Sequence, residues 1–432
     1  MWVRHRLDIG WRDLLVGAVK CLLPLDSDRL QERAQSCWPA TRGCIVTLSV
    51  RSGFDLLLRT LKLPAGSEVL MSALTVPDMA RIVEEHGLIP VPFDLEPDAA
   101  YPSIASLTRI ITPNSRLVVV AHLFGQRVHL APFAEICRQH QLMLVEDCAQ
   151  SFCGCQYGGD PLADVSMFSF GMIKTATAAS GAAICVSDRQ LANQMQVLLQ
   201  QDPIQSRHSF LLRLLRVALI KCLSLRMPLA IFVRCCHTFG LDYDRLANNA
   251  AKGFSPVQLM RRLRQQPSSP LLALLIRRWQ SYEDDVLKDR SAQGRWYGEQ
   301  LGAFDNDGSN TWWQHTHWVF PVLVEHAQQL AMALRFAGFD ATHRLRMCVI
   351  SPSSAGEPTA TPNASRLVDQ LVMLPWYHEL PDHELLRMAE IVREYHGRPL
   401  PESAPHDSLT AISDRRPSAT YPARGRWDRT DA

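Results

Sequence analysis

Short apolar runs alternate with helix-length amphipathic stretches between residues 46 and 200. Such runs predict buried strands, and stretches with apolar residues at helical spacing predict helices. Strands that alternate with helices of about ten or more residues favour a mainly parallel sheet covered on both faces, so the expected fold class is α/β. The strand candidates are CIVTLSV, GSEVLMSAL, LIPVPFDL, SRLVVVAHLFG, QLMLVEDCA, VSMFSFG and AAICVS; the helix candidates are SGFDLLLRTLKL, opening at Ser52–Gly53, PDMARIVEEHG, stopped by Gly87, and LAPFAEICRQHQ.

A different pattern begins near residue 200. The stretch SFLLRLLRVALIKCLSLRMPLAIFVRCC is apolar, but an arginine or lysine recurs every few positions. At about 100° per residue, Arg213, Arg216 and Lys221 fall within an arc of roughly 140°, which predicts an amphipathic helix with a basic stripe. So many charges exclude a membrane-spanning helix. Two interpretations stay open: a helical insertion packed on the body or on a second subunit, and a face resting on an anionic membrane surface.

The same patterns divide the chain into segments. Residues 46–200 are expected to form a large domain, and residues 312–399 a smaller α+β domain that contains the strand HWVFPVLV. One long helix, PLLALLIRRWQSYEDDVLKDRSAQGRWYGEQL, is expected to connect them within residues 266–311. The other segments are a helical lead-in at 1–45, the amphipathic insertion at 201–265, and a tail at 400–432 whose Pro, Arg, Asp and Ser content predicts disorder.

Composition excludes several classes of protein. With 432 residues, 47% hydrophobic and 20% charged, the chain is expected to be globular rather than fibrous or disordered. A net charge of +2 gives no long-range reason to bind nucleic acid. The twelve cysteines have no zinc-binding spacing, so no metal site is expected, and free thiols indicate a reducing cytoplasm. The start, MWVRHRLDIGWRDLLVGAVK, does not have the pattern of a signal peptide.

Lysine is scarce in this chain, and Lys174 lies between two apolar runs in SMFSFGMIKTATAASGAAICV. The strand LMLV ends in Glu146–Asp147, which places a carboxylate at the edge where α/β sheets bind ligands. A carboxylate and an amine that emerge from neighbouring strands form either a salt bridge or a pyridoxal phosphate site. That cofactor needs an amine for its covalent linkage and a carboxylate that keeps its ring nitrogen protonated.

The cofactor also needs donors for its phosphate. The segment Arg51–Ser52–Gly53 precedes a helix, where backbone N–H groups and the helix dipole favour an anion. Ser169, on the strand before Lys174, offers another hydroxyl. Taken singly, Ser52 and Ser169 are equally explained as an ordinary cap residue and an ordinary strand residue.

Together these segments resemble the cofactor-binding core of the DegT/DnrJ/EryC1/StrS family of sugar aminotransferases. The resemblance covers roughly residues 46–200, rests on VEDCAQSF and FSFGMIKTATAASGAAI, and resumes more weakly in the small domain. It implies an aspartate-aminotransferase-like fold (PLP fold type I), pyridoxal 5'-phosphate as cofactor and a homodimer. It also implies that Lys174 forms the Schiff base and shuttles the proton. The other implied contacts are Asp147 with the pyridine nitrogen, Gln150 with the ring, Ser169 with the phosphate, and Arg51, Ser52 and Gly53 at the family's phosphate loop.

The chain departs from the family pattern in three places. Val76 stands where an aromatic residue is usual, TAASGAA replaces a Gly-Glu-Gly-Gly run after the lysine, and an Asn-Tyr-Arg-Met segment is not recognisable. These differences favour a divergent branch with an altered substrate or lost activity. Lys174 itself stands where the family's sugar dehydratases carry histidine, which favours transamination over dehydration.

Two functions therefore compete. The first is a pyridoxal-phosphate-dependent aminotransferase that moves an amino group from glutamate to a nucleotide-linked keto-sugar in polysaccharide, glycan or secondary-metabolite biosynthesis. The second is a catalytically inactive binding or scaffold protein on the same fold. Either is expected in the cytoplasm, and residues 209–236 add peripheral contact at the inner membrane face as an open alternative. His315 and His317 are not expected to bind metal, and the tryptophans beside them are interpreted as core or subunit contacts. His122 is interpreted as a core or strand-end residue, with an approach to the substrate as the alternative.

Overall fold

The computed structural model describes residues 1–239, 241, 246, 259–302, 315–343, 347–350 and 361–400. These residues belong to one compact unit, Met1–Glu402. The tail predicted to be disordered lies outside the described residues, apart from Leu400. Parts of the segments predicted at 201–265, 266–311 and 312–399 lie outside them as well.

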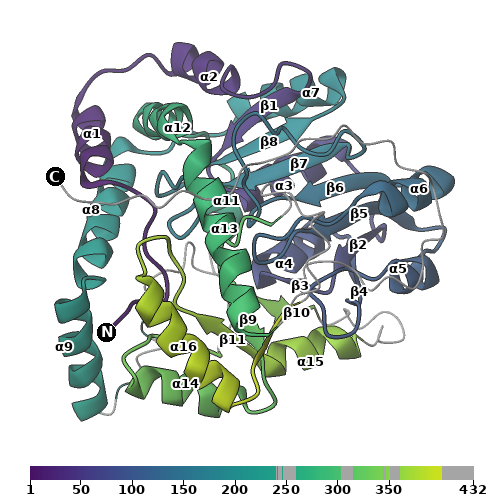
Figure 1. Cartoon of the computed structure of the whole chain (residues 1–432). Coiled ribbons are helices and arrows are strands. Elements are labelled where there is room, and N and C mark those ends of the chain that lie inside the picture. The colour runs from purple at the N-terminus through teal and green to yellow at the C-terminus, as the bar shows by residue number, and fades with distance from the viewer. Residues whose placement is uncertain are drawn as a thin grey trace, which may run out of the picture. The chain divides into compact units, whose positions relative to one another are not determined.

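A sheet of seven strands lies at the centre of the described chain (Figure 1). The strands follow the order β1-β8-β7-β6-β5-β2-β4. Neighbours from β7 to β4 run parallel, whereas β8 is antiparallel to both β1 and β7, so the prediction of a mainly parallel sheet is confirmed. The strands are β1 (Gly43–Thr47), β2 (Glu68–Ser72), β4 (Ile89–Phe93), β5 (Ser115–Ala121), β6 (Met143–Asp147), β7 (Val165–Ser169) and β8 (Ala182–Val186).

Helices cover both faces of this sheet, and its strands are therefore apolar on both sides. In β5, Leu117 and Val119 pack into one core, whereas Val118 and Val120 pack into another. The first face carries α3 (Val50–Leu61), α4 (Pro77–Glu85) and α7 (Arg189–Gln200); the second carries α2 (Ser27–Gln35), α5 (Ile104–Ile110), α6 (Ala131–His140) and α12 (Ser269–Ser281).

The prediction of one long helix between the two domains is wrong, because two helices occupy the segment. Helix α12 ends at Ser281, and α13 (Asp284–Gln300) begins after Tyr282 and Glu283, whose backbones are extended. The Tyr282 hydroxyl donates to an Asp8 carboxylate oxygen at 2.8 Å. This contact with the N-terminal segment stabilises the extended residues between the two helices. Helical periodicity cannot predict a contact with a segment so distant in the chain.

The amphipathic stretch also forms two helices, α8 (Arg207–Leu223) and α9 (Arg226–Thr238), instead of the single helix predicted. Helix α8 packs beside α1 (Trp11–Leu22) and on α12. The predicted basic stripe is wrong for Arg213, which turns inward to Ser180, while Arg216 is exposed. No helix in the described part of the chain combines the length and the apolar character needed to cross a bilayer.

After α13 the chain builds a smaller sheet. Strand β9 (Phe320–Leu323) lies between β11 (Leu371–Leu374) and β12 (Arg398–Pro399), and α14 (Ala327–Phe336) and α16 (Asp382–Glu394) share a core with it. A short pairing of β3 (Leu74–Thr75) with β10 (Cys348–Val349) ties this part to the loop after β2. The described residues also form α11 (Leu259–Leu263) and α15 (Pro362–Gln370). The domain boundaries at 46–200 and 312–399 stay a proposal.

Candidate functional site

Asp147 and Ser169 lie at the same edge of the central sheet. Asp147 is the last residue of β6, and Ser169 is the last residue of β7. The two strands run parallel, with Asp147 opposite Met167. The carboxyl ends of parallel strands meet at one edge, which is where α/β sheets bind ligands. The fold thus brings these two predicted residues to one location.

Lys174 lies in the loop that joins β7 to β8. Its backbone N–H donates to the Gly171 carbonyl oxygen at 2.9 Å, which turns the loop back toward β7. A Cβ placed on Gly171 would lie 3.7 Å from Ser169 Oγ and 4.0 Å from Lys174 Cγ. The serine hydroxyl and the lysine stem therefore both lie within van der Waals distance of the position where a side chain at residue 171 would begin.

The indole of Trp318 lies against the Lys174 amine. Lys174 Nζ is 3.9 Å from the centroid of the Trp318 ring, and Trp318 Nε1 donates to the Ile173 carbonyl oxygen at 3.0 Å. A cation over an indole face gains about 0.5–2 kcal/mol. The sequence pattern indicated only a core or subunit role for this tryptophan. Its contact with the lysine joins segments far apart in the chain, so no local pattern identifies it.

Asp147 and Lys174 share one electrostatic environment. Burial raises the pKa of Asp147, while a backbone hydrogen bond from Ala149 and the positive charge of Lys174 act in the opposite direction. The Ala149 N–H donates to Asp147 Oδ1 at 2.9 Å. A partly desolvated carboxylate is stabilised by any cation that approaches it. This carboxylate is therefore suited to a positively charged ring nitrogen.

Gln150 connects the loop after β6 with two other loops. Its Oε1 accepts the Phe124 N–H at 2.9 Å, and its Nε2 lies 3.2 Å from Met347 Sδ. Phe124 has a φ of 59°, a left-handed conformation that this hydrogen bond helps to hold. The contact of Gln150 with a cofactor ring stays a prediction.

Helix α3 begins earlier than the sequence pattern indicated. Ser49 is its N-cap: Ser49 Oγ accepts the Ser52 N–H at 3.2 Å and lies 3.1 Å from Ser52 Oγ. The Gly53 N–H donates to the Ser49 carbonyl oxygen at 3.0 Å, and α3 begins at Val50, two residues before the predicted opening at Ser52–Gly53. A Cβ on Gly53 would lie 2.3 Å from Ile184 Cδ1, and glycine is therefore needed for the close packing of α3 on β8.

Positive charge gathers beside the start of α3. Arg51 forms an ion pair with Asp78. Arg213, which reaches in from α8, donates to Ser180 Oγ at 3.3 Å, and Ser180 Oγ donates to the Leu48 carbonyl oxygen at 2.9 Å, one residue before the cap. Burial and the charges of neighbouring arginines, Arg51 among them, lower the pKa of Arg213. Residue spacing placed Arg213 on the basic stripe of a predicted helix. The packing of α8 on the body is what turns this side chain toward Ser180, beside the start of α3.

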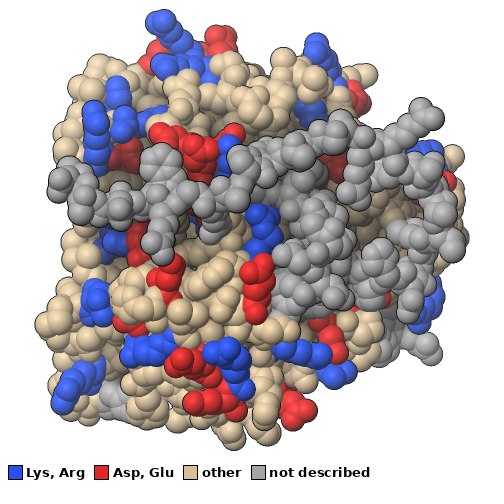
Figure 2. All heavy atoms as spheres, viewed as in Figure 1, with Lys and Arg blue, Asp and Glu red and all other residues tan. Residues whose placement is uncertain are grey.

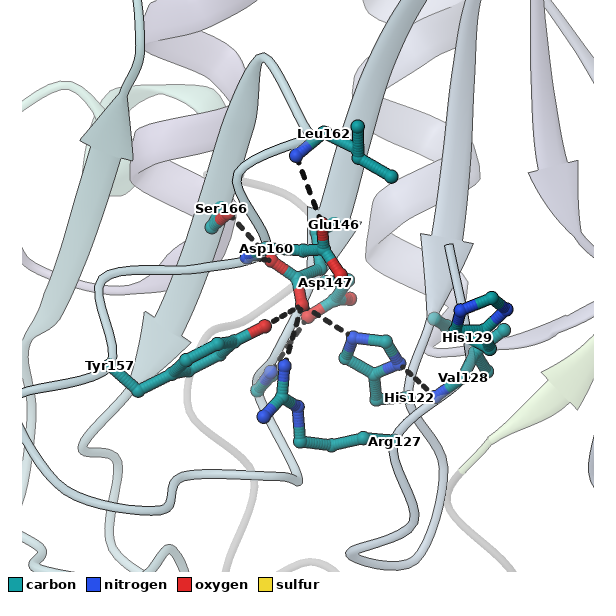
Figure 3. Close-up of polar contacts among 12 residues, drawn as sticks. His122, Arg127, Val128, His129, Glu146, Asp147, Tyr157, Asp160, Leu162 and Ser166 are labelled. Carbon is teal, nitrogen blue, oxygen red and sulfur yellow. Dashed lines mark hydrogen bonds and ion pairs between the residues drawn. The ribbon is translucent and has the colours of Figure 1, made fainter. Parts of the chain in front are cut away.

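Glu146 is the centre of a buried hydrogen-bond network next to the site (Figure 3). Burial opposes its ionisation, but hydrogen bonds from His122 and Ser166 and the charge of Arg127 lower the pKa of Glu146 to about 2. The donors to its carboxylate are His122 Nε2 at 2.7 Å, the Tyr157 hydroxyl at 2.7 Å, Ser166 Oγ at 2.6 Å and the Asp160 N–H at 2.9 Å. The network joins β6 and β7 to the loops that follow β5 and β6, and it thereby fixes the backbone that carries Asp147.

His122 takes part in this network as a neutral imidazole. Its Nδ1 accepts the Val128 N–H at 2.9 Å, so Nε2 carries the proton that it donates to Glu146. His122 is 1% exposed, which confirms its interpretation as a core residue. The ligand atoms of His122, Glu146 and Cys148 lie within 4.8 Å of one another. The Glu146 oxygens are already occupied by hydrogen-bond donors, so this geometry is that of a structural network.

Residues 31–209 match the DegT/DnrJ/EryC1/StrS aminotransferase family. The chain is 30% identical over 177 residues to the GDP-perosamine synthase of Caulobacter vibrioides, which covers 40% of this chain and 47% of that protein. It is 31% identical over 174 residues to the L-glutamine:2-deoxy-scyllo-inosose aminotransferase of Streptomyces fradiae, covering 40% of this chain and 41% of that protein. The chain thus matches less than half the length of these curated relatives.

Solved structures resemble the described fold over most of its length. The aminotransferase TlmJ from Streptoalloteichus hindustanus superposes with a TM-score of 0.66 at 17% identity, covering 92% of this chain and 99% of that one. DesI, solved in the presence of its TDP-sugar product, superposes with a TM-score of 0.62 at 20% identity, covering 91% and 92%. At such identities the likeness establishes the fold alone, and the expected aspartate-aminotransferase-like architecture is confirmed.

Proposed function

We propose that this chain, whose residues 31–209 belong to the DegT/DnrJ/EryC1/StrS aminotransferase family, is a pyridoxal-phosphate-dependent sugar aminotransferase. It transfers an amino group, with glutamate as the donor, to a keto-sugar carried on a nucleotide, in polysaccharide, glycan or secondary-metabolite biosynthesis. The observation that carries the proposal is that Asp147 ends β6 at the carboxyl edge of the sheet, within electrostatic reach of Lys174 in the loop after β7. The TDP-sugar named with DesI supports the substrate class.

The residues present fit the ring end of the cofactor. Lys174 supplies the amine that holds it, and Asp147 supplies the carboxylate for its ring nitrogen. Gly171 carries no side chain, and a Cβ there would occupy the space next to Ser169 Oγ and the lysine stem. When bound, the cofactor supplies an electron sink that stabilises negative charge on the substrate carbon.

The residues at the start of α3 fit the phosphate end. Ser52 in the first turn of α3 offers a hydroxyl group, as does Ser169 at the end of β7, and a helix N-terminus favours an anion. Arg51 and Arg213 add positive charge there, and Arg213 comes from the insertion rather than from the family's usual phosphate segment. Hydrogen bonds between guanidinium and phosphate are among the stronger ones in proteins.

Proton transfer falls to Lys174. Its Nζ takes a proton from the substrate carbon and returns it to the acceptor atom, acting first as a base and then as an acid. The Trp318 ring, held by its hydrogen bond to the Ile173 carbonyl oxygen, would stabilise the ammonium form of Lys174 that arises when Nζ takes the proton. Asp147 stays ionised when it faces the ring nitrogen, because the opposite charge outweighs its burial.

The proposed setting is a homodimer in the cytoplasm. All twelve cysteines are free thiols, which supports a reducing compartment.

The test of the proposed function is a spectrum of the purified protein with added pyridoxal phosphate, before and after an amino donor. A lysine-bound cofactor absorbs near the edge of the visible range, and glutamate is expected to bleach that band while 2-oxoglutarate appears in equal amount. Glutamine is tested beside it, because one relative is named for that donor. A bound cofactor that no donor converts would instead favour the second function, a binding or scaffold protein on the same fold.

Arg213→Gln is expected to weaken pyridoxal phosphate binding by roughly tenfold to a hundredfold, because a hydrogen bond to a charged group contributes about 1.5–3 kcal/mol. Pyridoxal, which has no phosphate, should bind the variant and the wild type equally well. Both constants can be measured by absorbance titration of the cofactor-free protein. Arg216→Gln is the matched control, since this exposed arginine lies on the same helix. Equal loss of both ligands would assign Arg213 a structural role only.

A further inference from the structure

Helices α1, α8 and α9 expose a continuous band of large apolar side chains, which we call the outer face. In α8 the exposed leucines recur at three- and four-residue spacing, so they form one stripe along the helix. Their exposed fractions lie between 40% and 59%, and Leu22 and Met227 reach 77% and 73%. The outer face comprises Trp11, Leu15, Val19 and Leu22 of α1, Leu212, Leu215, Leu219 and Leu223 of α8, and Met227 and Ile231 of α9.

The stripes of α1 and α8 point to the same side of the molecule. Arg207 at the start of α8 donates to the Leu23 carbonyl oxygen after α1 at 2.7 Å, and Lys221 Nζ near the end of α8 lies 5.7 Å from the Trp11 ring. The two helices are therefore antiparallel neighbours. Both pack on α12, so their opposite faces turn away from the body together. Figure 1 shows α1, α8 and α9 along one side of the described chain.

This band is larger than an ordinary surface patch. Ten side chains of this size at about half exposure present on the order of 1,000 Å² of apolar surface, whereas the largest patch on a typical monomer is about 300–600 Å². Burying this band therefore requires a partner surface. The charged residues near the band indicate what kind of surface that partner has.

The charged side chains that α1, α8 and α9 themselves carry are basic, apart from Asp13. No acidic residue occurs between Asp202 and Asp242, a stretch that contains Arg207, Arg216, Lys221, Arg226 and Arg234 besides the inward-turned Arg213. On α1 the only acid, Asp13, is buried against Arg277 and Arg278, while Arg12 is exposed. In Figure 2 the left edge, where α8 and α9 lie, is mainly tan with scattered blue. A second copy docked by a two-fold axis would bring like charges together, whereas an anionic bilayer surface complements them.

We infer that the outer face of α1, α8 and α9 docks this protein on an anionic membrane surface. The apolar side chains enter the boundary between headgroups and acyl chains, and the arginines and lysines contact the phosphate groups of the lipids. This inference goes beyond the proposed function, because it requires neither cofactor nor turnover. Lys174→Ala should therefore bind vesicles as the wild type does, whatever becomes of the enzymatic proposal.

The experiment is flotation of the purified full chain with vesicles of phosphatidylcholine, alone or with about 30% phosphatidylglycerol. Most of the protein should float with the anionic vesicles and little with the neutral ones, and binding should fall as salt is raised from about 0.1 to 0.5 M. Leu215→Asn with Leu219→Asn, and separately Arg12→Glu with Arg216→Glu, should each weaken binding at least tenfold. The matched control is Met332→Asn with Phe336→Asn, which changes two exposed side chains of α14 and should leave binding unchanged.

Failure to float with either vesicle, or equal flotation with both, would overturn the inference. Analytical sedimentation of the wild type and of the variant with Leu215→Asn and Leu219→Asn tests whether a second copy of the chain covers the outer face instead. If these substitutions dissociate an oligomer and the wild type binds no vesicles, the outer face belongs to a second copy and the membrane assignment is wrong. Near-ultraviolet circular dichroism of each variant confirms that it is folded.

Discussion

Lys174→Ala is expected to abolish the absorption band of the bound cofactor and to lower amino transfer by at least about 10⁴-fold, since it removes both the covalent anchor and the proton carrier. The partner groups stay in place, because Asp147 and Ser169 are held by their own strands. Noncovalent cofactor binding should persist through the phosphate end. The absorbance spectra of the variant and the wild type with pyridoxal phosphate measure the band. Borohydride reduction of the wild type, followed by peptide mass analysis, should find the cofactor on the peptide that contains Lys174.

Lys221→Ala is the matched control for this variant. Lys221 is also partly buried and also lies near an indole, with Nζ 5.7 Å from the Trp11 ring, but it lies on α8 and not in the loop between β7 and β8. Its replacement should leave the band and the rate unchanged. A reduced adduct found on any other lysine, or a normal band in Lys174→Ala, would refute the assigned site.

Glu146→Gln is expected to lower the free energy of unfolding by about 3 kcal/mol at pH 7. The pKa of Glu146 falls from an ordinary 4.5 to about 2 in the folded protein, and one pKa unit corresponds to about 1.4 kcal/mol. The glutamine keeps the volume but turns an NH₂ group toward the donors His122 and Ser166. Equilibrium unfolding in urea at pH 7 measures the difference, with Glu135→Gln on the exposed surface of α6 as a control that should not change stability.

The pH dependence of this difference follows from the direction of the pKa shift. Because the folded pKa lies below the unfolded one, the stabilisation is complete above about pH 4.5 and is lost as the pH falls toward 2. The gap between wild type and Glu146→Gln should therefore narrow across that interval. A gap that is constant between pH 5 and pH 3 would show that the carboxylate charge does not contribute to stability.

The candidate site divides into residues that local patterns identified and residues that they could not. Asp147, Ser169 and Lys174 follow short apolar runs in a chain that alternates strands and helices, and such runs place them near one sheet edge. Trp318 and Arg213 carry no comparable signal. Each reaches the site from a segment far away in the chain, through contacts with Lys174 and Ser180.

The helix boundaries also divide into those that local patterns predicted and those that they did not. Helical periodicity runs without interruption across Tyr282 and across Ser224, so it predicted one helix at each place where two occur. At Tyr282, the break is held by a hydrogen bond to Asp8 near the N-terminus. Likewise, Ser52–Gly53 suggested the opening of a helix, whereas glycine is needed at position 53 because a Cβ there would collide with Ile184 on β8.

The sequence by itself determined the α/β class, the mainly parallel sheet, the strand-end positions of Asp147 and Ser169 and the place of Lys174 in the loop that follows, because periodicity and strand ends are properties of neighbouring residues. The tertiary structure decided which arginine turns inward, which indole contacts the lysine, which donors stabilise the charge of Glu146, and which helix faces stay exposed. These depend on how distant segments pack, and packing is set by the shape and burial of the whole core rather than by any local pattern.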